Sequence, residues 1–148
     1  MMNDLVLNHW LNESSLPGVD SVAFRNDNIV ILNCYRNEEG KEFAFPFCDT
    51  SIKDLIKYDE DIWTEVQTFA QTEDVASGFI YIGGEGGMGN EGFIACLDSD
   101  RLFVWSVFFE HSNPFEKLEL DAEHIYAFST SGKTYKLRKD DPRSIVIL

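Results

Sequence analysis

The sequence lacks long apolar runs, paired cysteines and a recognisable export signal, and each absence excludes a class of protein. No apolar stretch approaches the roughly 18 residues that a membrane-spanning helix needs. The three cysteines, Cys34, Cys48 and Cys96, are widely spaced without a CxxC pair, which argues against disulfides or zinc and favours buried free thiols. The N-terminus shows no cationic stretch followed by an apolar one, so we expect a cytoplasmic protein.

Positive charge is also scarce, with 12 Lys and Arg against 26 Asp and Glu and a net charge of −14. Phosphate contacts need clustered cations, so the balance disfavours nucleic acid and anionic membranes as partners. No Lys or Arg lies between Lys57 and Arg101, whereas seven cations balance seven acids from Arg101 onward. A field of one sign speeds association with a cationic partner, although acidic surfaces also serve solubility alone. The acids of this cation-free window are Asp59, Glu60, Asp61, Glu65, Glu73, Asp74, Glu85, Glu91, Asp98 and Asp100.

The sequence contains no motif that carries chemistry by itself. His9, His111 and His124 have neither each other nor a cysteine at metal-ligand spacing, and HExxH and GxSxG are absent. Pairing Cys96 or Ser112 with His111 would give a nucleophile and a base, but no spacing requires either pair. We therefore predict no catalytic residue, no metal ligand and no cofactor, and hence a protein that is not an enzyme.

The most distinctive stretch is IGGEGGMGNEGF, from Ile82 to Phe93, which holds six of the ten glycines. Strand-like runs at 79–82 and 93–97 flank it, so we predict a long, mobile hairpin loop between two core strands. A GxGxxG spans Gly84 to Gly89, but no helix follows and no P-loop lysine is present, which argues against phosphate binding. The stretch is then either a flexible connection or a contact loop for a partner.

The apolar periodicity predicts a single α+β domain over residues 1–148. One long amphipathic helix is expected at about 51–71, capped by Thr50 or Ser51, although Tyr58 and Asp59 interrupt its stripe and leave two shorter helices open. A short N-terminal helix capped by Asn3 or Asp4 is expected to run to about Glu13. The other segments alternate between strands and turns, which indicates a mostly antiparallel sheet.

Aromatic residues mark two strands and one turn. In strand 42–47 the rings of Phe43, Phe45 and Phe47 share one face, which predicts that this face is buried, and Pro46 indicates an edge or a strand end. Strand 102–109 is apolar on both faces, as a central strand covered on each side would be. Phe109 and Phe115 flank the turn after it, either as exposed anchors for a partner or as the end of the core.

Three stretches resemble the immunity proteins of bacterial toxin–immunity systems, including contact-dependent inhibition. They are GGEGGMGNEGF (83–93), FFEHSNPF (108–115) and HIYAFSTSGKTYKLRKDDPRSIVI (124–147) in a small, acidic, single-domain chain. The resemblance lies in overall style and maps no functional residue. It implies a cytoplasmic inhibitor that caps a cognate toxin, commonly a basic nuclease.

The sequence thus predicts a protein-binding inhibitor with a basic toxin as partner and without nucleic acid or membrane as a ligand. A roadblock- or profilin-like scaffold that associates with itself is the alternative, and a small enzyme with a pocket under the glycine stretch is a third reading. The predicted partner-binding residues are Asp59, Glu60, Asp61, Glu65, Glu85, Asn90, Glu91, Phe109 and Phe115.

Overall fold

A computed structural model describes residues 4–148 and shows a mostly β protein, with 54% strand and 11% helix. The α+β prediction is therefore wrong in its proportions, although every strand pairing is antiparallel as expected. The helices are α1 (Leu5–Glu13) and α2 (Ile52–Tyr58). The strands are β1 (Ser15–Pro17), β2 (Ser21–Phe24), β3 (Asn28–Arg36), β4 (Glu42–Ser51), β5 (Trp63–Glu65), β6 (Gln67–Glu73), β7 (Ile80–Glu85), β8 (Gly92–Leu97), β9 (Phe103–Phe109), β10 (Phe115–Leu120), β11 (His124–Ser129), β12 (Thr134–Arg138) and β13 (Asp141–Ile147).

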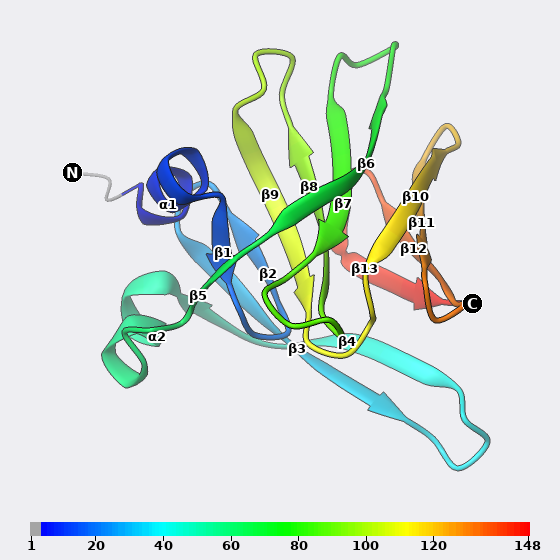
Figure 1. Cartoon of the computed structure of the whole chain (residues 1–148), viewed down its shortest axis with the longest axis horizontal. Coiled ribbons are helices and arrows are strands. Elements are labelled where there is room, and N and C mark those ends of the chain that lie inside the picture. The colour runs from blue at the N-terminus through cyan, green and yellow to red at the C-terminus, as the bar shows by residue number, and fades with distance from the viewer. Residues whose placement is uncertain (1–3) are drawn as a thin grey trace.

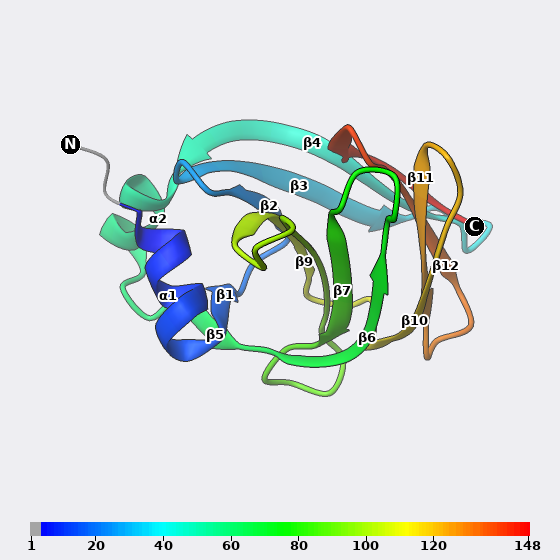
Figure 2. The same ribbon diagram turned by 90° about the horizontal axis from the view of Figure 1, so that it is seen from above.

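A seven-stranded sheet in the order β4-β3-β2-β9-β8-β7-β6 forms the centre of the molecule (Figure 1). A four-stranded sheet, β10 to β13, packs on one face, while the helices and the small β1–β5 sheet lie toward the other (Figure 2). Strand β9 is central and buried on both faces, as predicted: Trp105 and Val107 pack toward the four-stranded sheet, and Phe103 and Phe108 pack toward the helices. Two separate apolar cores therefore hold the layers together.

The long helix expected at about 51–71 does not form. Ser51 caps α2 as predicted, since its hydroxyl accepts a hydrogen bond from the Asp54 N–H at 3.2 Å, but the backbone becomes extended at Asp59. Residues 63–73 instead form β5 and β6, and β6 is the edge strand that pairs with β7. Threonines recur along this segment and favour a strand. The segment therefore pairs in a sheet, although the spacing of its apolar residues also fits a helix. Neither helix of the described chain has the length and apolarity to cross a bilayer.

The cap of α1 comes from a distant residue rather than from its own N-terminus. Asp4 makes no side-chain cap bond, and Asn3 lies outside the described residues. The buried carboxylate of Asp27, in the β2–β3 turn, accepts hydrogen bonds from the N–H groups of Leu5 at 3.0 Å and Val6 at 2.9 Å. The Asp27 carbonyl also accepts a bond from the Ile52 N–H at 2.9 Å, so this one turn anchors the start of both helices.

We expect Asp27→Asn to lower the free energy of unfolding by about 1–2 kcal/mol, because an amide offers one acceptor where the carboxylate offers two. Asparagine also tolerates the left-handed φ of 72° at this position, so the backbone itself is not strained by the change. Urea denaturation measures the loss. Asp4→Asn is the matched control with the same chemical change at a residue without a cap bond, and an equal loss in both variants would contradict the assignment.

Candidate partner-binding site

The glycine-rich stretch is a hairpin connection between two core strands, as predicted, but it is shorter than expected. Gly83 and Gly84 lie within β7 and Gly92 lies within β8, so the connection is 86–91. It closes on itself, because the Met88 N–H donates to the Glu91 carboxylate at 2.9 Å and the Glu91 N–H donates to the Met88 carbonyl at 3.0 Å. Glu91, predicted to meet a partner, therefore holds the loop in shape.

The connection lies directly against the turn that follows β9. The Asn113 N–H donates to the Asn90 carbonyl at 2.9 Å, and the Asn90 amide contacts His111 Nδ1 at 3.3 Å. A methyl group at Gly92 would overlap the Asn113 carbonyl and the Ser112 hydroxyl, so only glycine allows this close approach. Two stretches that the sequence marks separately are thus neighbours in space.

The predicted acidic residues lie in loops and at strand ends, because the helix expected at about 51–71 ends at Tyr58. Asp59, Glu60 and Asp61 are exposed in the loop after α2, and Glu65 is exposed on β5. Glu85 ends β7 and is half-buried; it pairs in register with Gln67, two residues beyond Glu65. Within the described chain, Asp74 is the one acid of the cation-free window that forms an ion pair, with Lys139 at 3.0 Å. The other nine acids form no ion pair within the described residues and give this part of the protein an excess of negative charge.

Phe109 and Phe115 are core residues, so the reading that they close the end of the core is confirmed and their use as exposed partner-binding anchors is wrong. They are 2% and 0% exposed, and both rings pack against Tyr135, with ring centroids 4.8 and 5.0 Å from it. Turns at the end of a two-layer β-sandwich bring such rings between the sheets, where they bury their full area.

A group of exposed aromatic residues lies instead on the long β3–β4 hairpin, which projects from the body (Figure 1). Tyr35, Phe45 and Phe47 are 45%, 47% and 71% exposed. The Phe43 ring stacks on both Tyr35 and Phe45, with centroids 5.1 and 5.8 Å apart, and the Tyr35 and Phe45 rings contact each other at 6.0 Å. The predicted burial is wrong for Phe45 and Phe47, whereas Phe43 is half-buried. We call the rings of Tyr35, Phe43 and Phe45, together with the more exposed Phe47 at the β-bulge of β4, the aromatic face.

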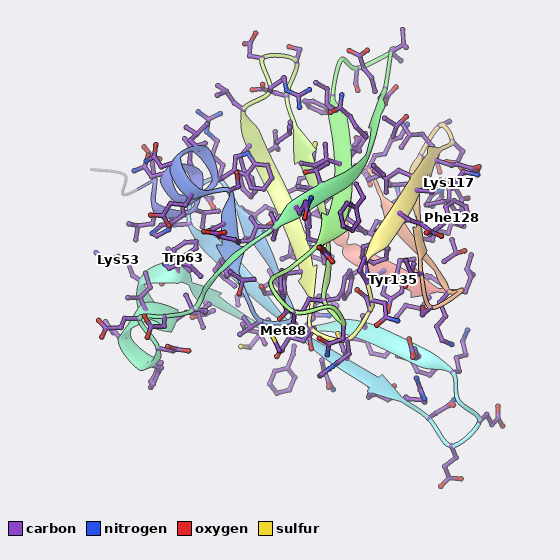
Figure 3. All side chains as sticks on the ribbon, in the orientation of Figure 1. Lys53, Trp63, Met88, Lys117, Phe128 and Tyr135 are labelled. Atoms are coloured by element: carbon purple, nitrogen blue, oxygen red, sulfur yellow. The ribbon has the colours of Figure 1, made fainter. Side chains whose placement is uncertain are left out.

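The described structure has a pocket of about 220 Å³ beneath the same hairpin, next to the His111 turn. Side chains from both sheets line it, including Tyr135 of β12, which is labelled in Figure 3. Its carboxylates are Asp20 and Glu42, and we call it the Asp20 pocket. It is lined by Asp20, Cys34, Tyr35, Arg36, Glu42, Phe43, Phe109, His111, Ser112, Tyr135 and Ile147.

The titratable groups of the Asp20 pocket lie in a negative and poorly solvated environment. Burial, with the nearby Glu110 carboxylate, raises the pKa of Asp20 above its usual range. Burial first and the Asp20 carboxylate second raise the pKa of the Cys34 thiol to about 12. Burial also raises the pKa of the Tyr135 hydroxyl, with a further contribution from Glu42. Cys34 thus stays a neutral thiol near pH 7 and lacks the depressed pKa of an activated nucleophile.

The nucleophile–base pairs considered from the sequence are not assembled. Cys96 lies in the core between the sheets, where burial raises the pKa of its thiol to about 12. The Ser112 hydroxyl donates to the Asn113 carbonyl at 2.8 Å, while His111 contacts Asn90. Cys48 is exposed, and Cys34 is exposed as a residue although its thiol lies beside Asp20 in the pocket, so the expectation that all three cysteines are buried is wrong. Across residues 4–148, no three His, Cys, Asp or Glu side chains group closely enough to hold a metal ion.

Comparison with models of protein families and with curated proteins gave no match to this chain.

Sequence reasoning missed both the Asp20 pocket and the aromatic face. Asp20, Cys34, Glu42 and Tyr135 are scattered over more than a hundred positions, and only the pairing of the sheets brings them together. The aromatic face did carry a signal, because Pro46 marks β4 as an edge strand. An edge strand with three alternating phenylalanines presents either a buried or an accessible apolar face, and periodicity alone does not separate the two.

Proposed function

We propose that this protein is a binding inhibitor of the immunity type that neutralises a basic protein toxin, of the nuclease kind that the resemblance implies. In this proposal the acidic surface attracts the partner, the aromatic face anchors it, and binding takes place in the cytoplasm. No catalytic step is part of the proposal.

One observation carries it: nine carboxylates between Lys57 and Arg101 have no ion-pair partner in the described chain. Six of the twelve Lys and Arg residues form ion pairs, for example Arg138 with Asp140 and Arg143 with Asp141, both at 2.9 Å. Unscreened charge of one sign concentrates an oppositely charged partner and raises its association rate. A toxin that binds nucleic acid through Lys and Arg has a positively charged surface that is complementary to this acidic one.

The test is capture from a lysate of the source organism on the immobilised chain, with elution in steps of rising salt. The variant Asp59→Asn, Glu60→Gln, Asp61→Asn and Glu65→Gln removes four exposed carboxylates and leaves Glu91, which shapes the loop, in place. We expect the wild-type chain to retain one basic protein stoichiometrically, and the variant to release it at distinctly lower salt.

A matched control neutralises four exposed acids outside the window: Glu38, Glu39, Glu116 and Glu123, each changed to Gln. It has the same net charge as the first variant, so it separates a local surface from the total charge. The proposal predicts nearly normal retention by this control. Equal weakening in both variants would reduce the effect to net charge and contradict a defined acidic site.

A further inference from the structure

We propose that the Asp20 pocket receives a single arginine side chain of the basic partner, with the guanidinium beside the carboxylates of Asp20 and Glu42. This inference rests on the proposed function, because it names the group through which the partner is recognised. The pocket, its walls and its charges each support it.

The size of the pocket suits one side chain better than a free metabolite. Its volume of about 220 Å³ is below the roughly 300–1,000 Å³ typical of sites for drug-sized ligands. Phe43, Phe109 and Tyr135 contribute aromatic surface to the lining. Such surface packs well on the aliphatic stem of a long cationic side chain and attracts its charged end.

One carboxylate of the pocket, that of Asp20, is held in place before any partner arrives. Asp20 Oδ1 accepts a hydrogen bond from the Glu110 N–H at 2.7 Å, and the Asp20 N–H donates to the Glu110 carboxylate at 3.2 Å. This reciprocal pair fixes two acids at the junction of β2 and β9. Acids oriented by the backbone lose little conformational freedom when they bind a cation, which favours affinity.

The pocket has more negative than positive charge. Glu42 is paired with Arg36 at 2.7 Å, but Arg36 is at the rim with 65% of its side chain exposed. Asp20 forms no ion pair within the described chain, and Glu110 beside it adds a further negative charge. An incoming guanidinium would relieve this excess, and its planar fork can donate to two carboxylates at once, which an ammonium group does less well.

The experiment is an NMR titration of the full chain, uniformly labelled with nitrogen-15, with N-acetyl-arginine N-methylamide. The matching citrulline compound is the control, since it has nearly the same shape and no charge. We expect saturable shifts around Cys34, Phe43, Ser112 and Tyr135 with the arginine compound, and at least about tenfold weaker binding of the citrulline compound. Equal binding of both compounds, or no saturable shift up to about 50 mM, would overturn the proposal.

Two variants locate the binding. Asp20→Asn keeps an acceptor for the Glu110 N–H but removes the charge, and Glu42→Gln does the same at the second carboxylate. Each is expected to weaken arginine binding at least about tenfold, whereas Glu39→Gln, exposed at the tip of the same hairpin, leaves it unchanged. If Asp20→Asn disturbs the fold, the Glu42→Gln variant still tests the proposal. An unchanged affinity of Glu42→Gln for the arginine compound would overturn the assignment.

The inhibitor proposal and the arginine-site proposal can be tested independently of each other. The titration uses a small probe, so it gives its result whether or not a toxin exists. The lysate experiment uses acids that lie outside the pocket, so a lost partner leaves the pocket result standing. Arginine binding without any captured partner would therefore contradict the inhibitor but keep the arginine site.

Discussion

Gly84→Ala is expected to lower the free energy of unfolding by about 3 kcal/mol or more, among the largest effects of a single methyl group in this chain. A methyl group at this position in β7 would overlap the carbonyl oxygen of Gln67 on the neighbouring strand β6. The obstacle is backbone, so the two strands must separate, and the edge strand then loses its ladder. For a domain of this size the loss corresponds to roughly 10 °C in melting temperature.

Gly89→Ala is the matched control in the same glycine-rich stretch, because a methyl group there meets nothing within 4 Å. Gly89 is also exposed and free of positive φ, so we expect a change within about 0.5 kcal/mol. Thermal denaturation of both variants measures the difference. Similar melting temperatures for the two would show that glycine serves loop flexibility here, and not close packing of strands.

The place of the glycine-rich stretch in the fold can be predicted from the sequence, but the role of its glycines cannot. Its place between two core strands is predictable, because strand-like runs flank it on each side. Its role is not predictable: in the described chain positive φ among the glycines occurs at Gly40, Gly78 and Gly132, outside the stretch. Glycines such as Gly84 and Gly92 are needed because other backbone comes close, and that neighbour is unknown until the sheet is assembled.

The missing long helix has a related cause. Residues 62–70 carry apolar side chains at a spacing that fits a helix face, and the sequence offers no proline to rule that helix out. This segment forms a strand because it pairs with β7, whose glycines let the backbone of β6 lie close beside it. Pairing with the next strand along the chain overrides the helical periodicity here, because strand preference depends strongly on context.

One part of the candidate site could be predicted from the sequence and the other could not. The acids between Lys57 and Arg101 can be recognised from the sequence alone, because charged residues usually lie at the surface. Anchors and pockets depend on tertiary structure, so Phe109 and Phe115 look as accessible in the sequence as Phe45 and Phe47 do. Only the folded sheets show that the first pair closes the core and the second pair is exposed.

Phe45→Ala combined with Phe47→Ala is expected to speed dissociation of the captured basic partner at least about 100-fold, because exposed aromatic residues supply most of the binding energy in typical interfaces. The two side chains are 47% and 71% exposed, so the stability of the free chain should change by less than about 1 kcal/mol. Their loss acts on the bound state, where apolar area is removed from water, and therefore raises the dissociation rate while the association rate stays nearly constant.

Phe69→Ala provides the control for this prediction. Phe69 is also 47% exposed, but it lies on β6 at the opposite edge of the seven-stranded sheet from β4. Surface plasmon resonance with the partner and sedimentation of the free chain together measure the outcome. Faster dissociation in the double variant alone supports anchoring by the aromatic face. Equal rates in both variants would contradict it, and a homodimer that the double variant abolishes would assign the aromatic face to a second copy of this chain, because an exposed apolar edge strand is equally suited to self-association.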